Sequence, residues 1–107
     1  MTNITVFSAD GKYDRILATN HAGFADEGED IVCAGISTLI TTFENSLEQL
    51  TDVKYMVRSV EDGEPVIDII IEDPNDLSQF LFESLLIGLN LIKEEYNDYI
   101  SLDYKEV

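Results

Sequence analysis

Basic residues are scarce in this sequence. Six Lys and Arg stand against 22 Asp and Glu, which gives a net charge of −16. Binding to phosphate groups requires clustered cations, and these six are scattered along the chain. We therefore expect neither direct nucleic-acid binding nor attachment to a membrane surface. The excess of acid would instead steer a basic partner toward the protein, unless it serves only to keep the protein in solution.

Cysteine and histidine are scarcer still. The single cysteine, Cys33, cannot form an internal disulfide, which suits a reducing compartment. The single histidine, His21, and the carboxylates near it do not combine with Cys33 in any standard zinc ligand spacing. We therefore predict no metal and no other cofactor.

Long apolar runs and signal-peptide features are missing as well. No run of about 18 apolar residues is present, so we predict no transmembrane helix. The N-terminal stretch, residues 1–6, lacks the basic and apolar regions of a signal peptide. Together with the lone cysteine, these absences predict a cytoplasmic protein.

The length and patterning predict one α+β domain over residues 1–107, which is long enough for a hydrophobic core. β-prone runs and helical periodicities follow one another in the order ββαββαβ. This order predicts a two-layer sandwich, with a mixed or antiparallel sheet and two helices on one face. The expected strands span residues 4–7, 13–18, 53–58, 66–71 and 99–104, and the expected helices span residues 31–50 and 75–96. Asp10-Gly11 is the predicted turn of the first hairpin.

Each predicted helix has a recognisable start. Asp30 is a good N-cap for the first helix. In the second helix, Asp73-Pro74 is typical of an N-cap residue followed by a proline at the first helical position. Apolar residues recur at helical spacing along the first helix and should face the core: Val32, Ile36, Leu39, Ile40, Phe43, Leu47 and Leu50. The second helix is apolar nearly all round, which indicates a second buried contact and therefore a dimer interface.

The stretch between the second strand and the first helix carries the candidate chemistry. Residues 20–30 lose periodicity and contain Gly23 and Gly28, which predicts a mobile loop over about residues 21–30. Cys33 falls at the third position of the helix that follows. Unpaired N–H groups and the positive end of the helix dipole gather there, and both stabilise a thiolate. The same N–H groups could hold the oxyanion of a tetrahedral intermediate.

A nucleophilic Cys33 needs a proton acceptor, and His21 is the only imidazole in the chain. Eleven residues separate the two, which is enough for the chain to turn back on itself. His21 would activate the thiol and then protonate the leaving amine. Asp30 either orients His21 or only caps the helix. Ser37, one turn beyond Cys33 on the same face, either contacts substrate or faces solvent.

The residues by themselves also permit plainer interpretations. A lone cysteine is often a small core residue, and a lone histidine in a loop is often only exposed. Acidic residues of the loop could contact a basic substrate or could simply be solvated: Asp26, Glu27, Glu29 and Asp30. The spacing therefore indicates a peptidase site without excluding an inert thiol.

The same stretch resembles a known family. The string His21-Ala22-Gly23, a short loop, and then Gly28-Glu29-Asp30-Ile31-Val32-Cys33-Ala34 is similar to the pattern of the ribosomal-processing cysteine protease family, Prp. That pattern is Gly-His-Ala, a short loop, and Gly-x-Asp-Ile-Val-Cys-Ala-Ala-x-Ser. It covers about eighteen residues, and the rest of the chain agrees in length and element order.

The resemblance implies a cysteine endopeptidase that removes the N-terminal extension of a large-subunit ribosomal protein during ribosome maturation. It places the family's nucleophile on Cys33, its base on His21, its aspartate on Asp30 and its serine on Ser37. It also implies a homodimer with a mobile loop over the site. The alternative is a non-catalytic, acidic, dimeric module that binds a basic ribosomal or assembly protein.

Two residues depart from the family pattern. Asn20 stands where the family has Gly, and Asn tolerates left-handed backbone angles better than most residues. Gly35 stands where the family has Ala, at a cost of about 1 kcal/mol in helix propensity, and would leave room for a substrate backbone. We expect these changes to affect substrate fit more than catalysis.

Overall fold

The computed structural model describes residues 1–20, 30–60 and 66–107, and its elements follow the predicted order. They are β1 (Thr2–Ala9), β2 (Lys12–Thr19), α1 (Ile31–Leu50), β3 (Lys54–Val60), β4 (Val66–Glu72), α2 (Asp76–Glu95) and β5 (Ile100–Glu106). The strands run slightly longer than their apolar runs predicted. The extra residues lie mostly at the strand ends. Strand pairing uses backbone groups, so it continues through polar residues there.

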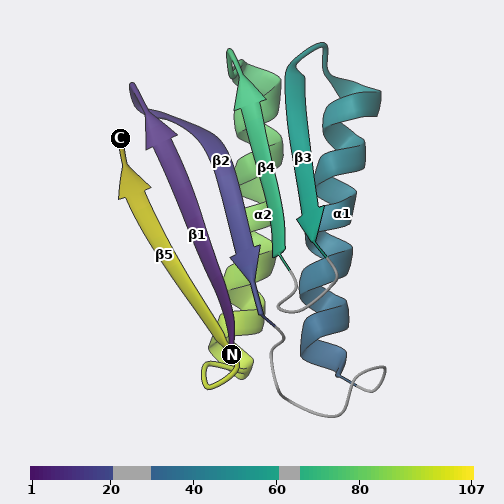
Figure 1. The fold of residues 1–107 in the computed structure, drawn as a ribbon, viewed down its shortest axis with the longest axis vertical. Coiled ribbons are helices and arrows are strands. Elements are labelled where there is room, and N and C mark those ends of the chain that lie inside the picture. The colour runs from purple at the N-terminus through teal and green to yellow at the C-terminus, as the bar shows by residue number, and fades with distance from the viewer. Residues whose placement is uncertain (21–29, 61–65) are drawn as a thin grey trace.

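The strands form one five-stranded sheet in the order β3-β4-β2-β1-β5. β1 pairs in parallel with β5, while the other three neighbouring pairs are antiparallel. Both helices lie on the same face of this mixed sheet (Figure 1). The predicted α+β two-layer sandwich is confirmed.

The first hairpin turns where the sequence predicted. Ala9 pairs with Lys12, and the two residues between them, Asp10 and Gly11, both have positive φ angles of 53° and 77°. Two central residues with positive φ match the right-handed twist of the flanking strands. The Asp-Gly pair therefore sets the pairing next to the turn, and the register then shifts by one residue between Phe7 and Ser8.

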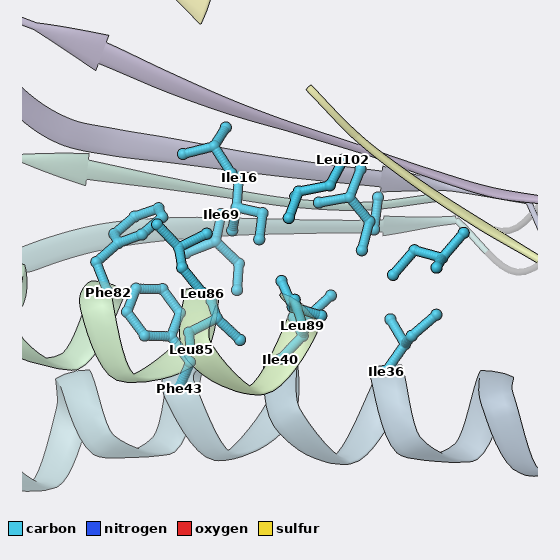
Figure 2. Close-up of a cluster of buried hydrophobic side chains, with 14 of the residues drawn as sticks. Ile16, Ile36, Ile40, Phe43, Ile69, Phe82, Leu85, Leu86, Leu89 and Leu102 are labelled. Atoms are coloured by element: carbon cyan, nitrogen blue, oxygen red, sulfur yellow. The ribbon is translucent and has the colours of Figure 1, made fainter. Parts of the chain in front are cut away.

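The core fills the space between the sheet and the two helices. Figure 2 shows Ile36, Ile40 and Phe43 of α1 on the helix side of a cluster that Ile16 and Ile69 meet from the sheet. The Phe82 ring of α2 packs edge-on against Phe43, with ring centroids 4.8 Å apart.

The apolar stripe of α1 behaves as predicted except at its end. Leu50 is 63% exposed, because it is the last residue of α1 and the chain turns away there. Thr51 caps this end, and its Oγ1 donates a hydrogen bond to the Leu47 carbonyl.

The start of α2 differs from the prediction. The N-cap is Asn75, not Asp73, and the helix begins at Asp76. The Asn75 side chain accepts from the Ser78 N–H at 2.9 Å, while the Ser78 hydroxyl accepts from the Asn75 N–H at 3.0 Å. This reciprocal capping box satisfies two backbone donors at once. Asp73 has a φ of 47°, which is not the extended backbone of an N-cap residue.

One side of α2 carries large apolar side chains that are more than half exposed: Leu77, Phe80, Ile87 and Leu91. They lie on the side of α2 away from the core, as the all-round apolar pattern of this helix predicted. Neither α1 nor α2 has the combination of length and apolarity that crossing a bilayer requires.

The face of the sheet without helices holds a buried carboxylate. Asp68 of β4 is 3% exposed, and it accepts two hydrogen bonds from Arg15 of β2, from Nε at 2.9 Å and from the terminal nitrogen at 2.8 Å. The hydrogen bond to Asp68 raises the pKa of Arg15. Arg58 of β3 approaches the same carboxylate at 3.6 Å, but its side chain is 68% exposed.

Replacing Arg15 should therefore destabilise the fold more than replacing Arg58. Arg15→Leu leaves the buried Asp68 carboxylate without its two-point partner, so we expect the free energy of unfolding to fall by about 1–2 kcal/mol. Arg58→Leu removes only an exposed, longer contact and should change it much less. Urea denaturation of the two variants measures the difference. Equal losses would contradict the two-point pairing.

Candidate active site

The candidate site lies at one end of the sandwich. The end of β2, the start of β1, the start of α1 and the last turns of α2 all lie there, at the bottom of Figure 1. The end of β2 and the first turn of α1 therefore lie at the same end of the sandwich.

Asp30 starts α1 as the sequence predicted. Its φ and ψ of −77° and 98° are extended, and its Oδ1 accepts a hydrogen bond from the Cys33 N–H at 2.9 Å. Its carbonyl accepts from the Ala34 N–H at 3.0 Å, which closes the first turn. Asp30 is buried, so the cap is shielded from water. The capping role predicted for Asp30 is confirmed.

The rotation of α1 places Cys33 at the boundary between core and solvent. Val32 and Ile36, on either side of it, are 2% and 4% exposed. Cys33 itself is half-buried and packs against the core from its edge. Ser37, one turn further on, is exposed. Cys33 thus packs against the core but keeps part of its surface exposed.

The cap changes which N–H groups could hold an oxyanion. The N–H of Cys33 already donates to Asp30, and that of Ala34 donates to the Asp30 carbonyl. The first N–H groups of a helix have no acceptor within it. In α1 that leaves the N–H groups of Ile31 and Val32 with no acceptor inside the helix.

Asn20, at the end of β2, adopts the left-handed conformation expected of it. Its φ is 71°, a value that L residues other than Asn and Asp rarely take. Its carbonyl accepts a hydrogen bond from the hydroxyl of Thr2 at 3.2 Å. Sequence reasoning missed Thr2, because its partner lies 18 residues away and no local pattern links the two.

Gly35 lies where α1 approaches α2. A Cβ at this position would lie 3.3 Å from Cδ1 of Ile92 in α2. The missing side chain allows the first turns of α1 to pack closely against the last turns of α2. The interpretation of Gly35 as room for substrate stays a prediction.

His21, Gly23 and Gly28 lie outside the described residues, as does most of the loop predicted over residues 21–30. The residues on which the site is built are therefore Asn20, Asp30 and the first turns of α1. Within residues 1–20, 30–60 and 66–107, no group of three or more His, Cys, Asp and Glu side chains could hold a metal ion.

Known proteins resemble this chain over nearly its whole length. The model of a family described as cysteine protease Prp matches residues 1–101. The ribosomal processing cysteine protease Prp of Staphylococcus aureus (strain Mu50) is 32% identical over 103 residues, which cover 96% of each chain. The protein of the same name from Bacillus subtilis (strain 168) is 30% identical over 87 residues, 75% of each chain.

The fold of one solved structure matches equally well. A crystal structure of the essential ribosomal processing protease Prp from S. aureus, in complex with a covalently linked product peptide, has a TM-score of 0.92 at 32% identity. The match covers 98% of this chain and 100% of that one. At this coverage the match spans nearly all of the elements described above.

Substitutions at Asp30 should separate capping from any other role. Asp30→Ala removes the acceptor of the Cys33 N–H, and we expect it to lower the free energy of unfolding by about 1 kcal/mol. Asp30→Asn keeps a side-chain oxygen at the cap and should retain most of that stability and most of the activity. Urea denaturation and peptide cleavage check both expectations. An Asp30→Asn variant of full stability but little activity would show that the charge, rather than the cap, matters.

Proposed function

This chain belongs to the Prp family of cysteine proteases, and on that premise we propose that it removes the N-terminal extension of a large-subunit ribosomal protein. We propose Cys33 as the nucleophile and His21 as the general base, within one protease domain that spans residues 1–107. We place this cleavage in the cytoplasm, where the enzyme would encounter a ribosomal protein precursor. A cysteine protease requires a reachable thiol, whereas a non-catalytic binding module does not, and the family assignment favours the protease.

The chemistry follows from the position of Cys33. His21 takes the thiol proton, and the sulfur attacks the carbonyl carbon of the scissile peptide bond. The oxyanion that forms accepts hydrogen bonds from the N–H groups of Ile31 and Val32. The carbon–nitrogen bond then breaks, and the proton passes from His21 to the leaving amine. A water molecule, deprotonated by His21, hydrolyses the thioester and restores the thiol.

The half-buried setting of Cys33 is the observation that carries this proposal. The cap of Asp30 fixes the first turn of α1, so that the thiol and the positive end of the helix dipole stay together. An inert core cysteine would be as fully buried as Val32 and Ile36, whereas Cys33 is only partly buried at the edge of the core. We assign Asp30 to positioning this turn and Ser37 to contact with the bound peptide.

A basic ribosomal substrate suits the distribution of charge. Four of the six cations lie on the face of the sheet without helices, as the alternation and pairing of the strands place them: Arg15, Lys54, Arg58 and Lys105. α1 carries no Lys or Arg at all. The helix side of the protein, where Cys33 lies, is thus dominated by acid, which raises the rate at which a basic chain arrives.

We further propose that the protein works as a homodimer that buries the exposed side of α2. The four apolar side chains there, with Phe80 at 73% exposure, lie along one side of the helix. Such stripes are unfavourable in water and are typical of surfaces that pair. Burial of this stripe against a second copy would explain why α2 is apolar on two sides.

Cleavage of the precursor tests the catalytic assignment. We expect Cys33→Ala and His21→Ala each to lower kcat by at least about a thousandfold, because each removes a reacting group. Thr41→Ala, at an exposed position further along α1, should cut normally and serves as the control. Mass spectrometry of the released extension gives the rates. If the wild type binds the precursor without cleaving it, the protein is a non-catalytic binding module and not a protease.

Charge placed on the α2 stripe tests the dimer. Phe80→Glu should raise the dimer dissociation constant by at least about tenfold, because a large apolar contact is replaced by a desolvated charge. Thr41→Glu adds the same charge on exposed α1 and should leave the dimer intact. Analytical ultracentrifugation over a range of concentrations measures both. A wild-type protein that stays monomeric at high concentration would contradict the proposal.

A further inference from the structure

A pocket of about 320 Å³ lies between α2 and strands β2 and β5. Each strand contributes a tyrosine to its lining, Tyr13 from β2 and Tyr104 from β5, and α2 contributes the carboxylates of Glu83 and Glu94. Apolar side chains of α2 complete much of the rest. Among the described residues that line the pocket, none is Lys or Arg. The pocket therefore offers acidic, aromatic and apolar groups but no cation of its own.

The aromatic and acidic groups of this pocket lie close together. Tyr13 is held at its backbone, where its N–H donates to the Gln79 side chain at 2.8 Å, and its ring stacks on Phe82 with centroids 5.3 Å apart. Burial raises the pKa of Tyr13, and the nearby Glu83 and Tyr104 raise it further. Tyr104 itself is 53% exposed. One wall of the pocket is thus fixed by the core, while the other is open to an incoming group.

This combination of groups suits the side chain of a lysine or an arginine. Tyrosine faces attract cations, carboxylates form charge-assisted hydrogen bonds with them, and the apolar stem of a long basic side chain packs on apolar surface. An anionic ligand would be repelled by Glu83 and Glu94. A metal ion would require a tighter group of ligands than the described residues provide.

The pocket lies on the far side of α2 from the thiol. Ile92 of α2 faces α1, since a Cβ at Gly35, two residues after Cys33, would lie 3.3 Å from its Cδ1. At about 3.6 residues per turn, Asn90 and Glu94, two positions on either side of Ile92, point to nearly the opposite side of α2. Helix axes pack about 8–10 Å apart and a helix radius adds about 5 Å, so the pocket lies about 15 Å from the first turn of α1. An extended chain covers that distance in about five residues.

We propose that this pocket is a second substrate site, which binds a Lys or Arg side chain of the ribosomal protein about five or more residues away from the scissile bond. The inference rests on the proposed function, because it takes a basic ribosomal protein as the substrate. Binding at the pocket strengthens the capture of the whole precursor and leaves the reaction at Cys33 unchanged. The pocket shares Ile87 and Leu91 with the exposed side of α2, but its charged and aromatic residues lie outside that set.

Cleavage of a long and a short substrate tests the second site. The long substrate is the full precursor, and the short one is a peptide with about three residues on either side of the scissile bond, too few to reach the pocket. Glu83→Gln combined with Glu94→Gln removes both charges and keeps the shapes of the side chains. We expect this double variant to raise KM for the precursor about fivefold with kcat unchanged, because uniform binding is lost. Its KM for the short peptide should equal that of the wild type.

Two substitutions of Tyr104 test the aromatic wall with the same pair of substrates. Tyr104→Leu removes the ring and should raise KM for the precursor about threefold, while Tyr104→Phe keeps the ring and should retain the wild-type KM. A Tyr104→Leu variant with the wild-type KM for the precursor would refute the aromatic contact and with it the site as proposed.

Glu95→Gln combined with Asp98→Asn is the matched control for charge. Both residues are exposed near the end of α2, neither lines the pocket, and the pair removes the same two charges. We expect the control to leave KM unchanged for both substrates. An equal rise in KM from the control, or a rise for the short peptide in the pocket variant, would overturn the second site.

The same measurements separate this inference from the proposed function. A wild type that cleaves the precursor, together with a pocket variant of unchanged KM, would refute the second site only. A wild type that cleaves neither substrate would refute the proposed function, and this inference with it.

Discussion

The burial of one apolar stripe of α1 against the sheet is the constraint on which the site depends. Val32, Ile36 and Ile40 can all be buried in only one rotation of the helix, and that rotation places Cys33 at the edge of the core and Ser37 in solvent. The second helix holds this arrangement by close contact. A Cβ at Gly88 of α2 would lie 2.8 Å from Cδ2 of Leu39 in α1, so any larger residue there would require the Leu39 side chain to shift. The thiol is therefore placed by packing, not by a loop.

The cap of α1 adds the second condition. Asp30 satisfies the N–H of Cys33 and keeps the first turn formed, but it also removes that N–H from the set of oxyanion donors. Its carboxylate interacts favourably with the helix dipole. One short turn thus holds both the capping carboxylate of Asp30 and the sulfur of Cys33, and the hydrogen bond from the Cys33 N–H joins the two residues.

Local sequence patterns predicted the features that depend on residues close together in the chain. The Asp10-Gly11 turn, the cap at Asp30 and the span of α1 all follow from neighbours in the sequence, and each is confirmed. The start of α2 was misassigned, because two caps competed and the reciprocal bonds of Asn75 with Ser78 outweighed the proline signal. The contacts of Thr2 with Asn20 and of Gly35 with Ile92 join residues far apart in the chain, so no spacing rule could indicate them.

The central claim is that Cys33 forms a covalent intermediate with the precursor, and acid-quenched mass spectrometry tests it most directly. Thioesters survive in acid, so enzyme mixed with precursor and quenched within one turnover should yield a Cys33-containing peptide that carries the N-terminal extension as an acyl group. The account predicts this adduct in the wild type and its absence in Cys33→Ser. Cleavage at the wild-type rate by Cys33→Ala, with no adduct on the wild-type sulfur, would contradict the account.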